Sequence, residues 1–192
     1  MRVSRVQAAE NRQTVINVAS RLFRERGFDG IGLKDLMEAA GLTQGAFYKQ
    51  FASKEDLAVE ASKRALESAS RRWSEATARN PDDPLGAVIG FYLSADHREE
   101  RMDGCPVVAL GSDAARQGPD VKAAFEEGIK AYLDVLGGFT AQSNSEESRR
   151  KAMGILATMV GAVTLSRAVN DPDLAQALLD AAVQQVRDAA AD

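Results

Sequence analysis

The amino-acid sequence predicts an all-α protein made of a small N-terminal domain of three helices and a larger helical domain. The five prolines stand at positions 81, 84, 106, 119 and 172, so the stretches between them can form long helices without an internal break. Apolar residues recur in these stretches at helical spacing, and no alternating strand pattern competes with them. Hydrophobic residues make up 45% of the 192 residues, which is typical of a chain with a packed core. We place the two domains at residues 1–54 and 55–192.

The first two helices are predicted over residues 11–26 and 33–40. Gly27 ends the first helix, and Gly32 can serve as a weak N-cap for the second. The buried face of the first helix consists of Val15, Ile16, Ala19, Leu22 and Phe23. The second helix is expected to turn Leu36, Met37 and Ala40 inward. Both helices are therefore amphipathic and can share one core.

A tight turn and a third helix follow. Gly41 can adopt the left-handed conformation that ends a helix, and the side chain of Thr43 can cap the next helix. The third helix is predicted over residues 44–50, with Phe47 and Phe51 one turn apart on its buried face. Its outer face carries Gln44, Tyr48 and Lys49. Two short helices joined by three residues form a helix-turn-helix, whose second helix can enter the major groove of DNA.

The rest of the chain is predicted to be helical as well. Ser53, with Asp56 three residues later, resembles a capping box at the start of a long helix. That helix runs through Ala58, Ala61, Ala65 and Ala69 toward Trp73. Further helices are expected at 85–96, 106–117, 119–139, 146–169 and 172–190. The breaks between them contain proline, glycine or short polar residues, including the polar stretch 142–145.

The charge is distributed unevenly between the two domains. Residues 1–54 hold nine Lys and Arg against five Asp and Glu, a balance of +4, whereas residues 55–192 hold fifteen against twenty-three, a balance of −8. The N-terminal domain is therefore the part expected to face a polyanion.

Several classes of protein are disfavoured. The first residues lack the apolar core of a signal sequence, and no run of about 18 apolar residues could span a bilayer, so we expect a cytoplasmic protein without membrane contact. One cysteine (Cys105) and one histidine (His97) are too few for a zinc site, and we expect no metal and no cofactor. Neither a nucleophile elbow nor a glycine-rich phosphate loop occurs, so we predict no catalytic residues and do not expect an enzyme.

The stretch AAGLTQGAFYKQFASKEDL at residues 39–57 resembles the signature of the TetR family of transcriptional regulators. The resemblance covers residues 10–60. It implies that Thr43, Gln44, Gly45, Tyr48 and Lys49 contact double-stranded operator DNA and that Lys54 contacts phosphate at the start of the following helix. Gly32 departs from the family pattern, which usually has a Ser or Thr there to cap the second helix and touch phosphate, so one contact is expected to be missing.

Residues 55–192 resemble the regulatory domain of the same family more loosely, at residues 104–111 and 165–169. The resemblance implies a homodimeric repressor that an unidentified small-molecule effector releases from its operator. In that family the inner helices enclose the effector pocket, and the candidate lining residues here are Trp73, Phe91, Tyr92, Met102, Phe125 and Tyr132. The alternative for each of these six residues is a purely structural place in the core.

The last two long helices are predicted to form a two-fold dimer through a four-helix interface. Close backbone approach is expected at Gly154, Ala157, Gly161 and Ala162. Apolar surface is expected from Leu156, Val160, Val163, Leu174, Leu178 and Val183. Such a dimer would place its two recognition helices one turn of DNA apart, roughly 34–36 Å.

Two single residues and one alternative function complete the expectations. His97 lies beside Asp96 and Arg98 near a helix end, and we expect it to be solvated and without a role. Cys105 precedes a helix, so it is either a reactive thiol that senses oxidants or electrophiles, or an inert, buried residue. A helical adaptor that binds protein is the other function class, and salt-dependent binding to promoter DNA would distinguish a regulator from it.

Overall fold

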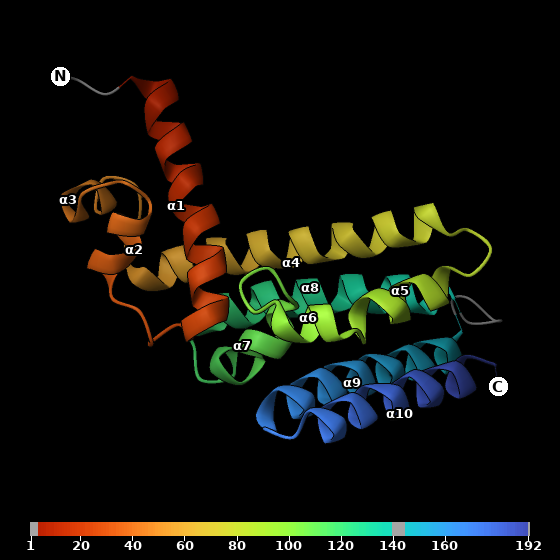
Figure 1. The fold of residues 1–192 in the computed structure, drawn as a ribbon. Coiled ribbons are helices and arrows are strands. Elements are labelled where there is room, and N and C mark those ends of the chain that lie inside the picture. The colour runs from red at the N-terminus through yellow and green to blue at the C-terminus, as the bar shows by residue number, and fades with distance from the viewer. Residues whose placement is uncertain (1–3, 140–144, 192) are drawn as a thin grey trace.

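The computed structural model describes residues 4–139 and 145–191, and in these residues the chain forms ten helices and no strand (Figure 1). The prediction of an all-α fold is confirmed. The N-terminal helices are α1 (Arg5–Arg26), α2 (Leu33–Ala39) and α3 (Gln44–Phe47). The others are α4 (Lys54–Arg79), α5 (Pro84–Tyr92), α6 (Ala95–Glu99), α7 (Pro106–Ala114), α8 (Pro119–Gly137), α9 (Glu146–Ala168) and α10 (Pro172–Ala191).

Three helix boundaries differ from the predictions for local reasons. Helix α1 begins earlier because the Ser4 side chain caps it by accepting a hydrogen bond from the Gln7 N–H at 3.1 Å. Helix α3 ends at Phe47 rather than near residue 50. The helix predicted at 85–96 is split in two, because Ser94 leaves the helical conformation and caps the separate helix α6. Apart from Ser145, which caps α9, the predicted break at 142–145 lies outside the described residues.

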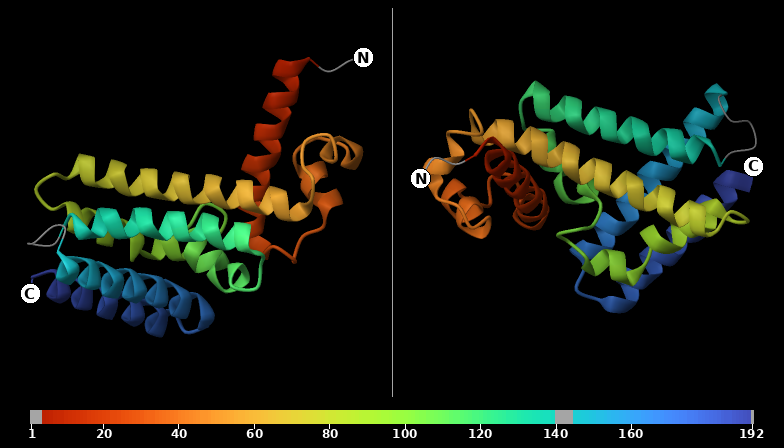
Figure 2. Two further views of the ribbon diagram at one scale, coloured as in Figure 1. Left: turned by 180° about the vertical axis from the view of Figure 1, so that it is seen from behind. Right: turned by 90° about the horizontal axis from the view of Figure 1, so that it is seen from above.

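The helices are arranged in layers behind the N-terminal domain (Figures 1 and 2). Helices α1 to α3 lie at one end, and the long helix α4 runs from them along the whole second domain. Helix α8 packs alongside α4, and α9 packs on α8 with α10 beside it. The short helices α5, α6 and α7 fill the space beside these long helices. The N-terminal helices are thus connected to the second domain by α4 and by the contacts of α1 with α4 and α7.

The core of the second domain is built on the small residues of α4. Ala58, Ala61, Ala65 and Ala69 are all buried, and the stripe ends in the buried Trp73, as predicted. Gly128 of α8 lies directly on this helix, since a Cβ atom there would come within 2.6 Å of Leu66. The two long helices therefore cross closely enough to hold the aromatic side chains between them in fixed positions.

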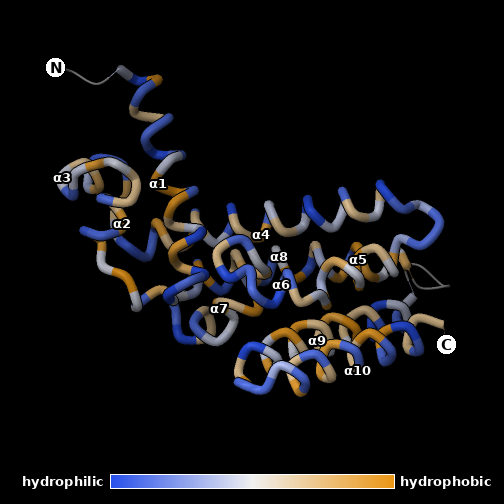
Figure 3. The backbone as a smooth tube through the Cα atoms, in the orientation of Figure 1, coloured by the Kyte–Doolittle hydropathy of each residue, from blue (hydrophilic) through white to orange (hydrophobic). Residues whose placement is uncertain are grey.

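The pair α9 and α10 keeps part of its apolar surface outside the core, and hydrophobic residues recur along both helices (Figure 3). Three residues predicted to supply the dimer surface are instead buried within the protomer: Val163 at 0%, Leu156 at 7% and Ala162 at 7% exposed. Because these side chains are shielded from solvent within the protomer, they cannot supply surface to a partner, and the prediction for them was wrong. The large hydrophobic residues that are exposed on these two helices are Met153, Leu165 and Leu174.

Candidate DNA-binding surface and its link to the regulatory helices

The turn between α2 and α3 is closed by backbone hydrogen bonds. Gly41 has φ +69°, and its N–H donates to the Glu38 carbonyl at 3.0 Å. The Leu42 N–H donates to the Met37 carbonyl at 2.9 Å. These two bonds with a left-handed glycine form a Schellman motif, as the position of Gly41 predicted in part. The angle between α2 and α3 is therefore fixed by the backbone itself.

Aromatic packing fixes the buried side of α3. Phe47 is fully buried, and its ring stacks on that of Phe51 with 5.3 Å between the ring centres. The Arg12 guanidinium from α1 lies over the Phe51 ring at 4.8 Å and pairs with Glu60 of α4 at 3.3 Å. Helix α3 is short, but contacts from α1 and α4 hold it in place.

The opposite side of α3 is open to solvent. Thr43, Gln44, Gly45, Tyr48 and Lys49 are all exposed there, and Tyr48 is the most exposed aromatic residue at 67%. The predicted side-chain cap by Thr43 is wrong: Thr43 occupies the N-cap position, but its side chain makes no capping bond. Its carbonyl instead accepts from the Ala46 N–H at 2.9 Å.

Gly45 has no structural reason to be glycine. A Cβ atom at this position would meet no atom within 4 Å, and its backbone is not left-handed. An alanine would fit the protein and would favour the helix. The missing side chain instead leaves the backbone of α3 bare on the exposed face.

The start of α4 carries Lys54 beside this face. Ser53 accepts a hydrogen bond from the Asp56 N–H at 3.0 Å, as predicted, while Asp56 accepts from the Ala52 N–H at 3.1 Å. This reciprocal pair fixes the first turn of the helix. Lys54 follows the cap directly and is half-buried. At Gly32, the N-cap of α2, no side-chain cap exists.

Four arginines of the N-terminal domain form ion pairs with carboxylates of the same chain. Arg12 pairs with Glu60, and Arg26 pairs with its neighbour Glu25. Arg21 and Arg24 both pair with Asp103, far along the chain. The positive balance of residues 1–54 therefore does not measure the charge available to DNA.

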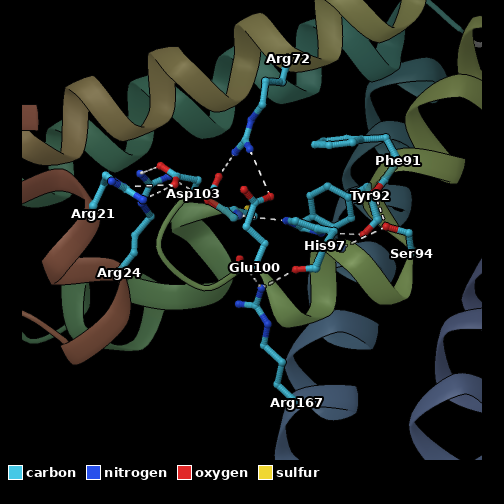
Figure 4. Close-up of polar contacts among 12 residues, drawn as sticks. Arg21, Arg24, Arg72, Phe91, Tyr92, Ser94, His97, Glu100, Asp103 and Arg167 are labelled. Carbon is cyan, nitrogen blue, oxygen red and sulfur yellow. Dashed lines mark hydrogen bonds and ion pairs between the residues drawn. The ribbon is translucent and has the colours of Figure 1, made fainter. Parts of the chain in front are cut away.

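Arginines from three helices converge on the segment between α6 and α7 (Figure 4). From α1, Arg24 donates to the Gly104 carbonyl at 2.9 Å, and Arg21 donates to the Asp103 carboxylate at 3.1 Å. From α4, Arg72 donates to the Asp103 carbonyl and pairs with Glu100 at 3.6 Å. We call these residues, with Arg167, the arginine junction.

Arg167 brings α9 into the same junction. Its guanidinium donates to the carbonyls of His97 at 2.7 Å, Arg98 at 2.8 Å and Glu100 at 3.2 Å. The backbone that leads from α6 to α7 is therefore bonded to α1, α4 and α9 at once. No local sequence pattern predicts this junction, because its partners are separated by up to 82 residues.

His97 lies inside the protein, contrary to the expectation that it is solvated. It is 2% exposed, its Nδ1 lies 2.7 Å from the Tyr92 carbonyl, and its Nε2 accepts from the Cys105 N–H at 3.0 Å. The Tyr92 carbonyl can only accept, so Nδ1 carries the proton and the ring is neutral. Burial, with the nearby Arg167 and Arg72, lowers the pKa of His97 to about 4.

Three of the six candidate pocket residues meet in the core. Trp73 stacks on Tyr132 with 4.6 Å between the ring centres and meets Tyr92 edge-on at 5.5 Å. Phe125 is buried on α8. Phe91 is half-buried between His97 and Arg72, and Met102 is half-buried in the segment before α7. The structure thus gathers Trp73, Tyr92 and Tyr132 into one aromatic cluster.

The described part of the chain offers neither a membrane span nor a cluster of metal ligands. No helix there is both long and apolar enough to span a membrane. Nor do three or more His, Cys, Asp and Glu side chains come together as potential metal ligands.

Comparison with known proteins agrees with this geometry. Residues 15–61 match the model of the family described as bacterial regulatory proteins, tetR family. The chain is 25% identical over 162 residues to the transcriptional regulator LmrA of Bacillus subtilis, covering 82% of this chain and 86% of LmrA. It is 24% identical over 130 residues to the transcriptional repressor NemR of Escherichia coli, covering 66% of this chain and 65% of NemR.

Solved structures share the fold over more than nine tenths of the chain. The structure of reduced E. coli NemR has a TM-score of 0.76 at 20% identity and covers 93% of this chain and 96% of that chain. The structure of FadR from B. subtilis with stearoyl-CoA has a TM-score of 0.67 at 18% identity and covers 91% of this chain and 96% of that chain. The relatives are regulators rather than enzymes. The chain belongs to the TetR family and is a DNA-binding transcriptional regulator.

Proposed function

We propose that this regulator is a homodimeric repressor that binds a near-palindromic operator through α3 and leaves it when a small-molecule effector binds the second domain. The observation that carries the proposal is the exposed polar face of α3, held by the Schellman motif and by the buried Phe47. A rigid helix with a polar outer face is what a major groove accepts.

Each residue of that face has a role in the proposal. Gln44 reads base edges, since its amide can both donate and accept, and Lys49 contacts a base edge or a phosphate. Thr43 and Tyr48 donate hydroxyl hydrogen bonds to phosphates. Gly45 allows the DNA backbone to approach α3. Lys54 contacts a phosphate at the start of α4.

The experiment is a titration of the purified protein against the DNA upstream of its own gene, with a scrambled duplex of the same composition as control. A salt series accompanies each titration. We expect preferred binding to the upstream DNA. We also expect the logarithm of the affinity to fall linearly with the logarithm of the salt concentration, with a slope of about 0.9 for each of several phosphate contacts. Equal affinity for both duplexes would contradict operator recognition, and loss of binding altogether would favour an adaptor.

We propose that the dimer forms through α9 and α10. Gly154, Ala157, Leu165 and Leu174 are exposed on this pair in the single protomer, and Val160, Gly161, Leu178 and Val183 are half-buried. Exposed Leu and Met side chains next to small residues suit a four-helix interface between two copies. Sedimentation at micromolar concentration tests the dimer, and a monomer that still binds the operator would contradict it.

We propose an effector site around the aromatic cluster Trp73, Tyr92 and Tyr132, with Phe125, Phe91 and Met102 nearby. In support, the related FadR was solved with stearoyl-CoA, and the related NemR is a repressor. This proposal keeps residues 1–54 as the DNA-binding domain and 55–192 as the effector-binding and dimerisation domain. A repressor of chromosomal genes acts in the cytoplasm, where its operator lies.

The arginine junction supplies a route between the two sites. A ligand that displaces Tyr92 also displaces the His97 ring bonded to its carbonyl, and His97 in turn holds the N-terminus of α7. The Gly104 carbonyl that Arg24 binds lies one residue before this point. A shift there moves α1 and with it the position of α3. A reporter driven by the upstream DNA tests whether the protein represses or activates transcription. For a repressor, expression should rise when the regulator's own gene is deleted.

A further inference from the structure

The aromatic cluster holds two polar groups that the fold leaves without partners. Tyr92 and Tyr132 are each 1% exposed, and neither hydroxyl finds a hydrogen-bond partner among the described residues. The Cys105 thiol lies beside both hydroxyls and is a weak hydrogen-bond partner, so neither hydroxyl has an oxygen or nitrogen acceptor. Burial, and after it the neighbouring Cys105, raises the pKa of both tyrosines, so both hydroxyls stay protonated and are donors.

Unsatisfied buried hydroxyls are uncommon in folded proteins because they lose their bonds to water and gain nothing in return. Phenylalanine would fill the same space at either position without that penalty. Two such hydroxyls lie side by side, on α5 and α8. Because they do not stabilise the fold, their presence indicates a functional role.

The charges around the cluster favour an anion. The Arg24 side chain is 3% exposed, and Arg72 and Arg167 reach the same region from α4 and α9. The charges of Arg72 and Arg24 act on Tyr132, and that of Arg167 acts on Tyr92, in each case opposing the effect of burial on the pKa. Asp103 and Glu100 offset part of this charge, but three guanidinium groups face two carboxylates, so the balance stays positive. Two hydroxyl donors beside this charge favour a ligand with negatively charged acceptor oxygens.

A groove opens at the surface beside α8, the helix that carries Tyr132. It has a volume of about 440 Å³ and lies between α7 and α8, with an apolar lining that includes Val107, Phe125 and Ile129. Lys122, Lys130 and Arg149 also line it, and because Glu126 pairs with Lys130 there, the remaining positive charge comes from Lys122 and Arg149. Phe125 lines the groove and lies two turns before Tyr132 on the buried face of α8, so the same helix face carries residues of the groove and of the cluster.

We propose that the effector is a small aromatic carboxylate whose ring enters the aromatic cluster and whose carboxylate accepts hydrogen bonds from the hydroxyls of Tyr92 and Tyr132. This inference rests on the proposed effector site of the second domain. It adds the chemical class of the ligand and the two donors that recognise it.

Trp73 provides the measurement, because it is the single tryptophan of the chain and stacks on Tyr132. The probe is benzoate, titrated into the intact protein while Trp73 fluorescence is followed. Toluene is the control for the ring without the carboxylate, and acetate is the control for the carboxylate without the ring. We expect saturable binding of benzoate that is about tenfold or more tighter than that of either control, as charge-assisted hydrogen bonds require.

The matched variants are Tyr92→Phe and Tyr132→Phe, with Tyr48→Phe as the control for benzoate binding because Tyr48 lies on the DNA-binding face. Each of the first two should weaken benzoate binding by about tenfold, the loss expected for one such hydrogen bond. Each should also unfold at the same or a higher urea concentration than the unmodified protein. If the hydroxyls had only a structural role, the Tyr→Phe variants would be less stable and would bind benzoate as the unmodified protein does.

The inference is overturned if benzoate binds no better than toluene, or if both Tyr→Phe variants bind it as the unmodified protein does. Operator titrations on the same samples separate this result from the proposed function. Operator binding without benzoate binding removes the ligand class and leaves the repressor proposal intact. Benzoate binding that leaves operator affinity unchanged supports the ligand class and contradicts release by it.

Discussion

The guanidinium of Arg24 on α1 donates a hydrogen bond to the carbonyl oxygen of Gly104, 80 residues further along the chain, at 2.9 Å. The same side chain donates to the Ser20 carbonyl at 2.9 Å and lies 3.6 Å from the Asp103 carboxylate. It is 3% exposed, so these partners replace its water. One buried cation therefore joins the first helix of the DNA-binding domain to the residue that precedes Cys105 at the N-cap of α7.

Replacing Arg24 by lysine should destabilise the protein by about 2 kcal/mol, because an ammonium group cannot reach all three partners and leaves buried acceptors unpaired. Burial lowers the pKa of Arg24 to about 10, which still leaves the side chain charged at neutral pH. Urea unfolding measures the loss. Arg26→Lys is the control on the same helix, since Arg26 is exposed and pairs only with its neighbour Glu25. Equal unfolding midpoints for the two variants would contradict a structural role for Arg24.

The sequence predicted the parts of this protein that depend on local chemistry. The turn at Gly41, the cap at Ser53 and the buried pair Phe47 and Phe51 follow from the residues and their spacing, and the structure has all of them. The cap at Thr43 was predicted by the same rules and is wrong, because the side chain of an N-cap residue can also point to solvent.

What the sequence could not predict is long-range. His97 looked solvated between Asp96 and Arg98, but the fold turns its ring inward between Tyr92 and Cys105. No local pattern around Arg24 predicts that it is buried, because its partner, the Gly104 carbonyl, lies 80 residues away. Val163 looked available for a dimer, but α9 has apolar residues on two faces, and the one with Val163 packs inside the protomer.

Single substitutions on the exposed face of α3 and at the start of α4 test which side chains contact DNA. Gln44→Ala should cost roughly 1–3 kcal/mol on the operator and little on scrambled DNA, as loss of a base contact does. Lys54→Ala should weaken binding to both duplexes and reduce the salt slope by about one. Lys130→Ala on α8 is a charge-matched control away from this face. If neither Gln44→Ala nor Lys49→Ala reduces operator affinity, the assignment of α3 is wrong.

Gly45→Ala should separate stability from DNA binding. The added methyl group meets no atom of the protein within 4 Å and favours the helix, so stability should rise by as much as about 1 kcal/mol. Operator affinity should fall, because the methyl group lies where the DNA backbone is proposed to approach. Gly90→Ala in α5 is the control: it also meets no atom within 4 Å and should stabilise the protein without changing DNA binding. A Gly45→Ala variant with full affinity would show that close approach is not needed there.

His97 should make the stability depend on pH between its two pKa values. The unfolded chain binds a proton with the ordinary pKa of 6.5, whereas the folded protein does so only at about 4. Between these values the unfolded state binds more protons, so stability is full above pH 6.5 and falls as the pH is lowered. The total loss is about 3 kcal/mol by pH 4, at up to about 1.4 kcal/mol per pH unit. In urea unfolding across this range, His97→Gln should show a shallower dependence; an unchanged slope would mean that carboxylates alone cause it.

Cys105 is the remaining reactive group, and its surroundings favour the inert of its two interpretations. It is 2% exposed, and its backbone N–H is bonded to the neutral ring of His97. A thiol reagent must contact the sulfur directly, so modification should require local opening of the segment before α7. We expect a disulfide reagent to label the protein slowly in buffer and rapidly in urea, with one thiol released per chain in urea.

Operator affinity decides whether Cys105 also senses redox changes. After mild treatment with the reagent in buffer, the unmodified protein and Cys105→Ser should both bind the operator as they did before treatment. A rapid loss of affinity in the unmodified protein alone would reverse the interpretation and make Cys105 a sensor. That outcome would also require the arginine junction to transmit the change, because modification of Cys105 displaces the Gly104 carbonyl that Arg24 holds. Arg24→Lys should then respond less to the reagent than the unmodified protein does.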